Sequence, residues 1–282
     1  MQRQHGCPGE SAQAPKGNSR YLVMQAAAST EEPTMPLDPA TCTIFQDLPR
    51  PGGSVDGCTR DIIRLLPPLR TPPAIIDLGC GRGYQTITLA AHFKAPVIAL
   101  DDDQAAIDQT VEAAAAAGVS ALIQPRLGSI AALPDAPGSF DLIWSECGVH
   151  RVGLEKALGL WEPLLRPRGV MVVGACGWIL PDPPAEAAGF WQRIYPGMTD
   201  TANVHAIAKR AGLRIDDSYS LPRSLWRKEY FEPLARRIVR YRKEGGLDAA
   251  AERRIQQAET EISMFDRWGD RFQYSYYLLR RA

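Results

Sequence analysis

The amino-acid sequence predicts an α/β fold with a largely parallel sheet that helices cover on both faces. Short apolar segments alternate with longer helical segments between residues 74 and 174. The first apolar segment runs directly into a glycine-rich turn. The chain has 282 residues, of which 45% are hydrophobic, and this suits one large domain with an elaboration. Because parallel strands need long crossover connections, the alternation indicates a parallel sheet.

The chain divides into three predicted parts. Residues 1–34 are rich in Gln, Ser, Ala, Pro and Gly without periodicity, which predicts a disordered tail. Residues 35–70 are predicted to form an N-terminal helical segment, because residues 59–66 have apolar side chains at helical spacing before two prolines. The rest is predicted to be the main domain at 71–282, with helical, aromatic-rich insertions at about 178–210 and 223–268.

The elements of the main domain follow from local patterns. Five strands are predicted from apolar runs at residues 74–78, 96–101, 122–127, 140–144 and 170–174. Pro125 indicates that the third strand lies at an edge. Helices are predicted at 86–93, 103–117, 154–165 and 204–211, with Asp102 or Asp103 as an N-cap and Gly118 as a stop. The chain then continues with a strand at 213–219, a charged helical stretch from 232 to about 268, and a β-prone final strand at 273–279.

Composition narrows the classes of function. The 32 basic and 32 acidic residues cancel, which argues against a dedicated nucleic-acid binder. The six cysteines include no C-x-x-C pair, and no His lies at zinc-ligand spacing from them, so no metal site is expected. The interpretation is buried thiols in a reducing compartment. No apolar run reaches the roughly 18 residues of a membrane span, and no signal peptide is recognisable, so a cytoplasmic location is expected.

The glycine-rich turn at residues 79–83 is the most informative segment. Glycines there allow a tight turn and let a ligand approach the backbone at the carboxyl edge of the sheet. A dinucleotide site needs a small residue where this chain has Tyr84. Asp101 ends the second strand and could accept hydrogen bonds from a ribose of either kind of cofactor. Asp77 would repel a pyrophosphate but attract an ammonium or sulfonium group.

The segment Asp77-Leu-Gly-Cys-Gly-Arg-Gly83 resembles motif I of the class I S-adenosylmethionine-dependent methyltransferases. The order of Asp101, the segment 128–130, the strand at 140–144 and the segment 164–169 fits the same family. Residues 48–54, 144–146 and 184–196 resemble bacterial proteins of the ubiquinone/menaquinone-methyltransferase-like group, which have a methyltransferase type 11/25 domain. The resemblance implies a Rossmann-like fold, with a mainly parallel seven-stranded sheet and an antiparallel last strand.

The resemblance also implies S-adenosylmethionine as the cofactor and roles for individual residues. The glycine loop would approach the methionine part and the ribose, Asp77 would lie near the amino group, and Asp101 would bind the ribose hydroxyls. Glu146 would face the methionine moiety or the acceptor. The residues implied to bind the cofactor are Asp77, Gly79, Cys80, Gly81, Gly83, Asp101, Asp102, Ser129, Ile130 and Glu146. Ser129 and Ile130 have an equally good interpretation as an ordinary loop residue and a core residue.

The acceptor of the methyl group is predicted to be an apolar or aromatic small molecule. Five aromatic residues follow the fifth strand and are candidates to line its pocket, or to form a core under added helices: Trp178, Trp191, Tyr195, Trp226 and Tyr230. His150 is a candidate general base together with Glu146, and the alternative for His150 is a loop histidine with a local hydrogen bond. Ala175 and Gly177 replace Glu and Ser of the similar proteins, which limits any transfer of their acceptor chemistry.

Two further hypotheses stay open at this point. The segment 223–254 has ten basic and five acidic residues, so it could dock RNA or a protein substrate. The alternative is a solvated helix face, because four basic residues lie at surface helical spacing: Arg236, Arg237, Arg240 and Lys243. The third hypothesis is a non-catalytic module that binds the cofactor or a partner. Aromatic helices in the C-terminal half could also form a homodimer interface.

Overall fold

Seven strands in the described part of the chain form one sheet with the order β3-β2-β1-β4-β5-β7-β6. The computed structural model describes residues 44, 48, 56–146 and 148–282. The predicted tail, Cys7, Cys42, Cys147 and most of the segment 35–55 lie outside these residues. The strands are β1 (Ile75–Leu78), β2 (Val97–Asp101), β3 (Ile123–Leu127), β4 (Phe140–Ser145), β5 (Leu165–Trp178), β6 (Leu213–Ser220) and β7 (Phe272–Arg281).

The sheet confirms the predicted fold class. Strands β1 to β5 pair in parallel, whereas β7 pairs antiparallel with both β5 and β6. The edge position predicted for the third strand is correct, because β3 pairs only with β2 in the strand order. The chain reverses at the glycine loop, where β1 is followed by α3, so this loop lies at the carboxyl edge of the parallel strands.

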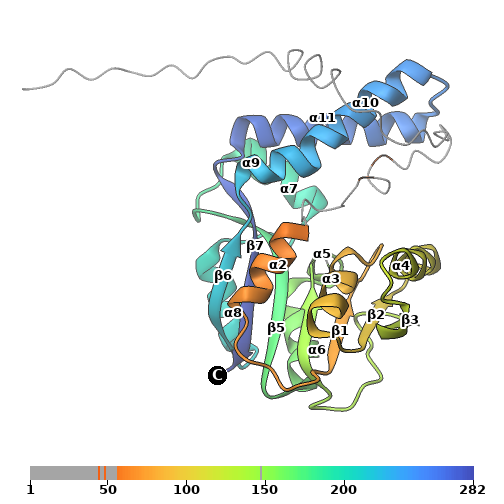
Figure 1. The fold of residues 1–282 in the computed structure, drawn as a ribbon. Helices are drawn as coiled ribbons and strands as arrows, with labels where there is room; N and C mark the ends of the chain where they lie inside the picture. The colour runs from red at the N-terminus through yellow and green to blue at the C-terminus, as the bar shows by residue number, and fades with distance from the viewer. Residues whose placement is uncertain (1–43, 45–47, 49–55, 147) are drawn as a thin grey trace, which may run out of the picture.

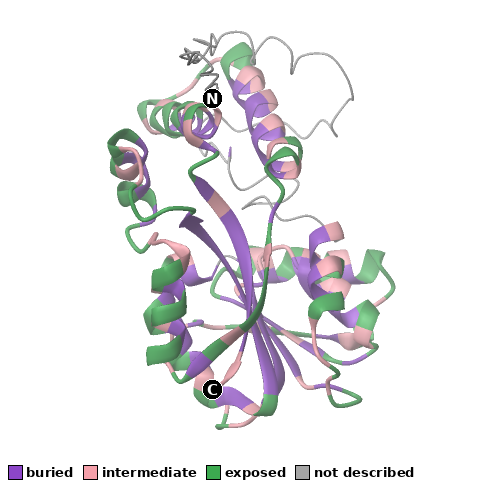
Figure 2. Cartoon of the chain, turned by 90° about the vertical axis from the view of Figure 1, so that its left-hand side faces the viewer, coloured by how far each residue is buried: buried purple, intermediate pink, exposed green. Residues whose placement is uncertain are grey.

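Helices cover the sheet on both faces, and each face has its own core (Figure 2). The helices α2 (Asp56–Leu65), α3 (Tyr84–Phe93) and α4 (Gln104–Ala116) pack in one cluster, and α5 (Val149–Val152), α6 (Leu154–Trp161) and α8 (Thr201–Arg210) pack in the other. Successive residues of β5 alternate between the two clusters, since side chains of a strand point to opposite faces. The Asp103 side chain accepts the N–H of Ala105 as the predicted N-cap.

A second layer of helices lies beyond the carboxyl edge of the sheet (Figure 1). We call it the cap: it consists of α7 (Ala185–Ile194), α9 (Arg223–Trp226), the π-helical turn η3 (Arg227–Phe231), α10 (Glu232–Glu244) and α11 (Ala249–Trp268). Its buried aromatic residues continue the core of the α2–α4 face without a break. The ring of Phe231 stacks on Phe265 with a centroid distance of 3.9 Å, which joins η3 to α11.

Three predicted elements differ from the structure. The fifth strand is much longer than residues 170–174, because β7 pairs with it from Met171 to Trp178. The charged stretch from 232 to 268 is two helices, since Gly245 and Gly246 adopt positive φ angles of 70° and 71° and end α10. The helix predicted at 154–165 ends at Trp161 and becomes a 3₁₀ turn, η2 (Glu162–Leu164), around Pro163.

Candidate cofactor and acceptor site

The glycine loop is bound tightly to the end of the neighbouring strand. Gly79, Gly81 and Gly83 have φ angles of 76°, 55° and 77°, a region that side-chain-bearing residues rarely adopt. The N–H groups of Gly79 and Cys80 both donate to the carbonyl of Leu100, at 2.8 and 3.0 Å. A Cβ at Gly81 would meet no described atom within 4 Å. The loop is therefore fixed in place while its backbone faces open space at Gly81.

Asp101 at the end of β2 completes this binding edge. Its side chain is buried, and one carboxylate oxygen accepts the N–H of Gly81 at 2.9 Å. The other oxygen accepts the N–H of Asp103 at 3.1 Å. An ionised carboxylate has about four acceptor positions, so both oxygens keep capacity for further donors. Asp101 thus holds the loop and is placed to receive a diol.

Asp77 is fully buried beneath the loop. The Thr86 hydroxyl and the Gln85 amide both donate to its carboxylate, the latter at 3.3 Å. Burial, reinforced by the negative charges of Glu146 and Asp101, raises the pKa of Asp77 to about 7. The salt bridges between described residues include none to Asp77 or to Asp101. The structure therefore concentrates negative charge under the glycine loop.

Glu146 lies at the end of β4 and is held from three directions. Its carboxylate accepts the Thr59 hydroxyl at 3.2 Å and the Trp144 indole N–H at 3.3 Å. Its backbone carbonyl accepts the hydroxyl of Tyr274 from β7. Sequence reasoning did not find Thr59 or Tyr274, since neither lies near a motif. Their contacts join α2 and β7 to the predicted cofactor edge.

The residues predicted beside the adenine have local partners. The two carboxylate oxygens of Asp102 pair with the guanidinium of Arg151, each at 2.7 Å. The Ser129 hydroxyl oxygen accepts the N–H of Ala131 at 3.2 Å. Ile130 is buried in the core of the α5–α8 face, and its carbonyl accepts the Trp161 indole N–H. All three residues lie at the carboxyl edge of the sheet. An exposed ion pair contributes no more than about 1 kcal/mol, so breaking the pair between Asp102 and Arg151 costs little free energy.

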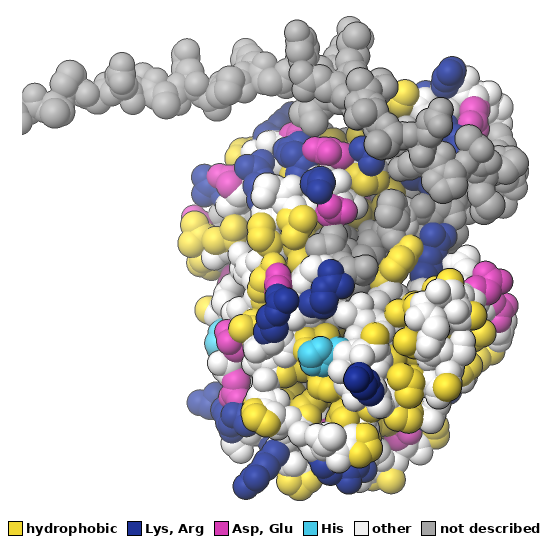
Figure 3. Space-filling view, viewed as in Figure 1, with side chains coloured by type: hydrophobic (Ala, Val, Ile, Leu, Met, Phe, Trp, Pro, Cys, Tyr) yellow, Lys and Arg dark blue, Asp and Glu magenta, His cyan; other side chains and the backbone are white. Residues whose placement is uncertain are grey.

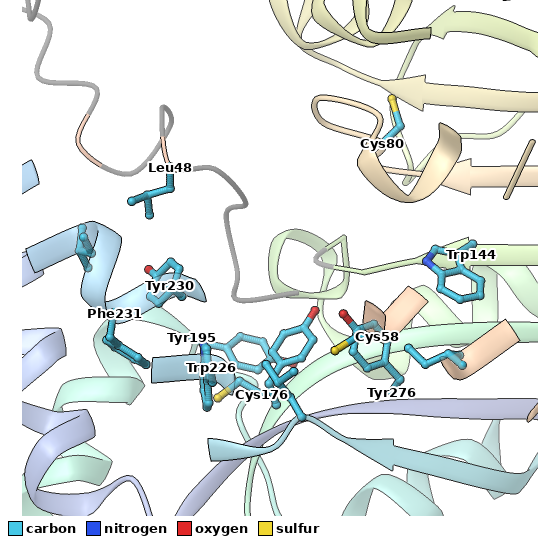
Figure 4. Close-up of a cluster of buried hydrophobic side chains, with 14 of the residues drawn as sticks. Leu48, Cys58, Cys80, Trp144, Cys176, Tyr195, Trp226, Tyr230, Phe231 and Tyr276 are labelled. Carbon is cyan, nitrogen blue, oxygen red and sulfur yellow. The ribbon is translucent and has the colours of Figure 1, made fainter. Parts of the chain in front are cut away.

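A cavity of about 270 Å³ opens between the sheet edge and the cap. Three of the five predicted aromatic residues line it, namely Trp191, Trp226 and Tyr230. Figure 4 shows Trp226, Tyr195 and Cys176 as members of one buried hydrophobic cluster. The remaining lining residues are His150, Cys176, Ile194, Gln257, Glu261 and Tyr274. Since Ile194 and Gln257 are exposed, they mark the mouth of the cavity.

Two predicted acceptor residues lie behind the cavity rather than in its lining. The Trp178 ring packs edge-on against Phe272 at 6.2 Å, as part of the core. The centroid of the Tyr195 ring lies 4.2 Å from that of the His150 ring, so Tyr195 packs against His150. Gln257 and Glu261 of α11 were missed, because a helix with mixed charges gives no sign in sequence of which polar residue turns inward.

His150 is a neutral side chain that faces the cavity. Its Nε2 accepts the backbone N–H of Cys176 at 3.3 Å, which places the ring proton on Nδ1. Burial lowers the pKa of His150 to about 4. The local hydrogen bond considered for this residue is therefore present. A histidine of such low basicity is a weak general base at neutral pH.

This pKa predicts a pH dependence of stability. Between about pH 6.5 and 4 the unfolded chain takes up a proton at His150 that the native protein does not, so stability is complete above this window and falls on acidification. The contribution between about pH 7 and 5 is no more than about 2 kcal/mol. In urea unfolding, the His150→Gln variant is expected to lose less free energy of unfolding than the wild type when the pH falls from about 7 to 5. Equal pH slopes for the variant and the wild type would contradict the lowered pKa.

Several basic residues of the segment 223–254 pair with acidic residues of the cap. Arg227 pairs with Asp266 at 2.8 Å, Arg240 pairs with Glu244, and Arg242 pairs with Glu252 and Glu259. Figure 3 accordingly shows basic and acidic side chains intermixed over the helices. Arg237 was expected on the surface but is only 7% exposed, because it lies among the buried residues of α10, which packs against α11. Together these contacts leave no uniform basic face among the described residues.

Comparison with known proteins agrees with this geometry. Residues 75–169 match the methyltransferase domain family. The chain is similar to trans-aconitate 2-methyltransferase of Deinococcus radiodurans, with 36% identity over 117 residues that cover 40% of this chain and 42% of that protein. It is also similar to malonyl-[acyl-carrier protein] O-methyltransferase of Methylovorus sp., with 28% identity over 128 residues that cover 42% and 40%. The chain thus spans about two fifths of the length of these curated relatives.

The fold agrees over a larger part of the chain. The structure of an S-adenosylmethionine-dependent methyltransferase from Thiobacillus denitrificans, in complex with S-adenosyl-L-homocysteine, superposes with a TM-score of 0.73. The match covers 87% of this chain and 99% of that one, with 16% identity. The superposition shows a Rossmann-like fold that this chain shares with an S-adenosylmethionine-dependent methyltransferase. Residues 75–169 carry the match to the methyltransferase domain, and S-adenosylmethionine is the cofactor named for the superposed protein.

The described residues fit this cofactor. S-adenosylmethionine supplies an electrophilic methyl group on a sulfonium and also carries an ammonium group. The negative charge gathered at Asp77, Asp101 and Glu146 complements these cationic groups, whereas it would repel the pyrophosphate of a dinucleotide. The open space at Gly81 leaves room for close approach to the backbone.

None of the described helices has the length and hydropathy needed to span a membrane. The described His, Cys, Asp and Glu side chains form no group that could hold a metal ion.

Proposed function

We propose that this protein transfers a methyl group from S-adenosylmethionine to a small apolar or aromatic molecule bound in the cavity under the cap. The observation that carries the proposal is the position of the cavity. Tyr274 lines it and also donates to the carbonyl of Glu146, so the cavity begins beside the cofactor edge. An in-line displacement requires such adjacency of acceptor and methyl donor.

The cofactor would be held along the loop. Backbone groups at Gly79, Cys80, Gly81 and Gly83 would approach the methionine part and the ribose. Asp77 and Glu146 would lie on the side of the ammonium group, and Asp101 would accept the ribose hydroxyls. Asp102, Ser129 and Ile130 would border the adenine, with Asp102 exchanging part of its ion pair with Arg151.

The chain's contribution to the reaction is alignment and exclusion of water. Aromatic walls surround the acceptor, and the cofactor brings its own leaving group. We assign His150 a positioning role, since its Nε2 is engaged with the backbone of Cys176 and its low pKa disfavours proton abstraction. Glu146 would act on the cofactor side, because its carboxylate is committed to Thr59 and Trp144.

The lining also limits the acceptor. No Lys or Arg is among the described residues that line the cavity. A carboxylate such as the trans-aconitate in one relative's name would find no countercharge there. RNA or protein docking at 223–254 is disfavoured by the internal ion pairs of that segment. A non-catalytic role is disfavoured because such a module needs no acceptor cavity beside the cofactor edge.

The cofactor assignment is tested by isothermal titration calorimetry. We expect S-adenosylmethionine to bind with a micromolar dissociation constant, which corresponds to a binding free energy of about −8 kcal/mol. We expect Asp101→Asn to weaken this binding at least about tenfold. Asp108→Asn is the control, since this exposed aspartate on α4 accepts a hydrogen bond only from Gln104 among the described residues. Unfolding curves of each variant separate loss of binding from loss of fold. Binding of NAD in place of S-adenosylmethionine would overturn the proposal.

We further propose a cytoplasmic location, supported by the buried thiols of Cys58, Cys80 and Cys176. The homodimer remains a prediction, which light scattering coupled to gel filtration checks directly.

A further inference from the structure

Among the described residues that line the cavity, one carries a carboxyl group, Glu261 of α11. Its side chain is only 7% exposed. The hydroxyl of Tyr230 donates to Glu261 Oε1 at 2.9 Å. Tyr230 lies on the π-helical turn η3, an insertion type that is frequent at functional sites. The two residues therefore form a polar group in an otherwise aromatic chamber.

The other described lining residues include no second carboxyl group and no Lys or Arg. Burial lowers the pKa of His150 to about 4, so this ring is neutral near pH 7. The remaining groups that can lose a proton are one thiol and two phenols, those of Cys176, Tyr230 and Tyr274. No ion pair joins Glu261 to the described residues of α7, α10 or η3, although α11 packs against α7 and α10. Glu261 thus sets the charge of the described lining.

Burial without a neighbouring cation disfavours the ionised form of a carboxyl group. Burial raises the pKa of Glu261 to about 7, because the charged form loses its hydration. A hydrogen bond from Tyr230 offsets only part of this cost. A cationic ligand in the chamber would restore the lost interaction, and an anionic ligand would worsen it.

The aromatic walls favour the same ligand. Trp191, Trp226, Tyr230 and Tyr274 surround the space, and the faces of such rings attract cations at distances within about 6 Å. The volume of about 270 Å³ is at the lower end of ligand pockets, which suits a compact molecule. Aromatic walls, one carboxylate and no Lys or Arg in the described lining together define the site.

We propose that Glu261 makes this cavity specific for a small protonated amine with an aromatic or apolar body. The ammonium group binds the Glu261 carboxylate, the Tyr230 hydroxyl orients that carboxylate, and the apolar body lies against the tryptophans. The inference rests on the proposed function only in treating this molecule as the methyl acceptor. Recognition of the amine itself requires neither cofactor nor methyl transfer.

Three ligands of closely similar shape test the charge preference on the unmodified protein. Phenethylamine is cationic, 2-phenylethanol is neutral and 3-phenylpropionate is anionic. Calorimetry at about pH 8 keeps both Glu261 and an aliphatic ammonium charged. We expect phenethylamine to bind at least about tenfold more tightly than the alcohol, and the acid to bind most weakly. Equal affinity for amine and alcohol, tightest binding of the acid, or no binding of phenethylamine would each overturn the inference.

A matched pair of variants tests the residue. Glu261→Gln keeps the shape and removes the charge, and we expect it to weaken phenethylamine binding at least about tenfold with a change of less than about threefold for 2-phenylethanol. Glu259→Gln is the control, because this exposed residue of the same helix pairs with Arg242 outside the cavity. An unchanged amine affinity in Glu261→Gln would also overturn the inference. Failure of the amine to bind while S-adenosylmethionine binds would leave the proposed function intact, and the reverse result would leave the amine site intact.

Discussion

Replacing Gly174 with alanine is expected to lower the free energy of unfolding by about 3 kcal/mol, the upper part of the range for overpacking a core. Gly174 lies in the middle of β5. A Cβ there would come within 2.4 Å of the carbonyl oxygen of Glu146 and 2.5 Å of the hydroxyl of Tyr274. The bond between these two groups crosses directly over the glycine. The substitution therefore strains the backbone of the site and the hydrogen bond together.

A double-mutant cycle separates the two parts of this effect. Tyr274→Phe in the Gly174→Ala background removes the hydroxyl but not the clash with the carbonyl, so we expect about half of the lost stability to return. Gly159→Ala on α6 is the control, since its Cβ would meet nothing within 4 Å and alanine favours a helix by up to about 1 kcal/mol. Urea unfolding measures the wild type, Gly174→Ala, Tyr274→Phe, the double variant and the Gly159→Ala control. A Gly174→Ala protein as stable as the wild type would show that the hydroxyl and the carbonyl do not meet there.

The sheet and the cofactor edge could be predicted because their signals are local. Each parallel strand is an apolar run, and the glycine loop carries its geometry in five consecutive residues, 79–83. Asp103 and Gly118 bound their helix through contacts within one turn. Patterns of this kind depend on neighbours in the chain, so the sequence alone determines them.

The cavity could be predicted only in part, because it joins distant segments. Glu261 and Tyr230 are 31 residues apart, and Tyr274 and Glu146 are 128 apart. The aromatic residues were recognisable as a group, but only packing decides that Tyr195 supports His150 while Trp226 lines the space. The length of β5 was missed for the same reason, since its extension depends on pairing with β7, about 100 residues later.

Asp77→Asn is expected to change stability and cofactor binding in opposite directions. With a pKa of about 7 in the native protein and about 3.8 in the unfolded chain, Asp77 favours the native state only below this window. Stability from this group is complete below about pH 4 and is lost as the pH rises to about 7. Asparagine removes the buried charge at the expense of one acceptor for Thr86 or Gln85. We therefore expect the variant without cofactor to be more stable than the wild type by about 2 kcal/mol at about pH 8.

Cofactor binding is expected to weaken in the same variant at least about tenfold, because the charge that complements the cationic groups of S-adenosylmethionine is reduced. In the wild type, binding should also weaken as the pH falls below about 7, since Asp77 must then release a proton. Glu146 and Asp101 remain in place in the variant, so the difference from the wild type reports the contribution of Asp77.

Urea unfolding and calorimetric titration, each measured at about pH 6 and 8, give both quantities on the same samples. Asp108→Asn again controls for the loss of one acidic group at the surface. A variant that loses stability at pH 8 would show that Asp77 is stabilised by its hydrogen bonds more than burial destabilises it. A variant that binds the cofactor as tightly as the wild type would show that the ammonium and sulfonium groups do not depend on this charge. The expected pair of opposite shifts follows only if the protein keeps a destabilising carboxylate because the bound cofactor neutralises it.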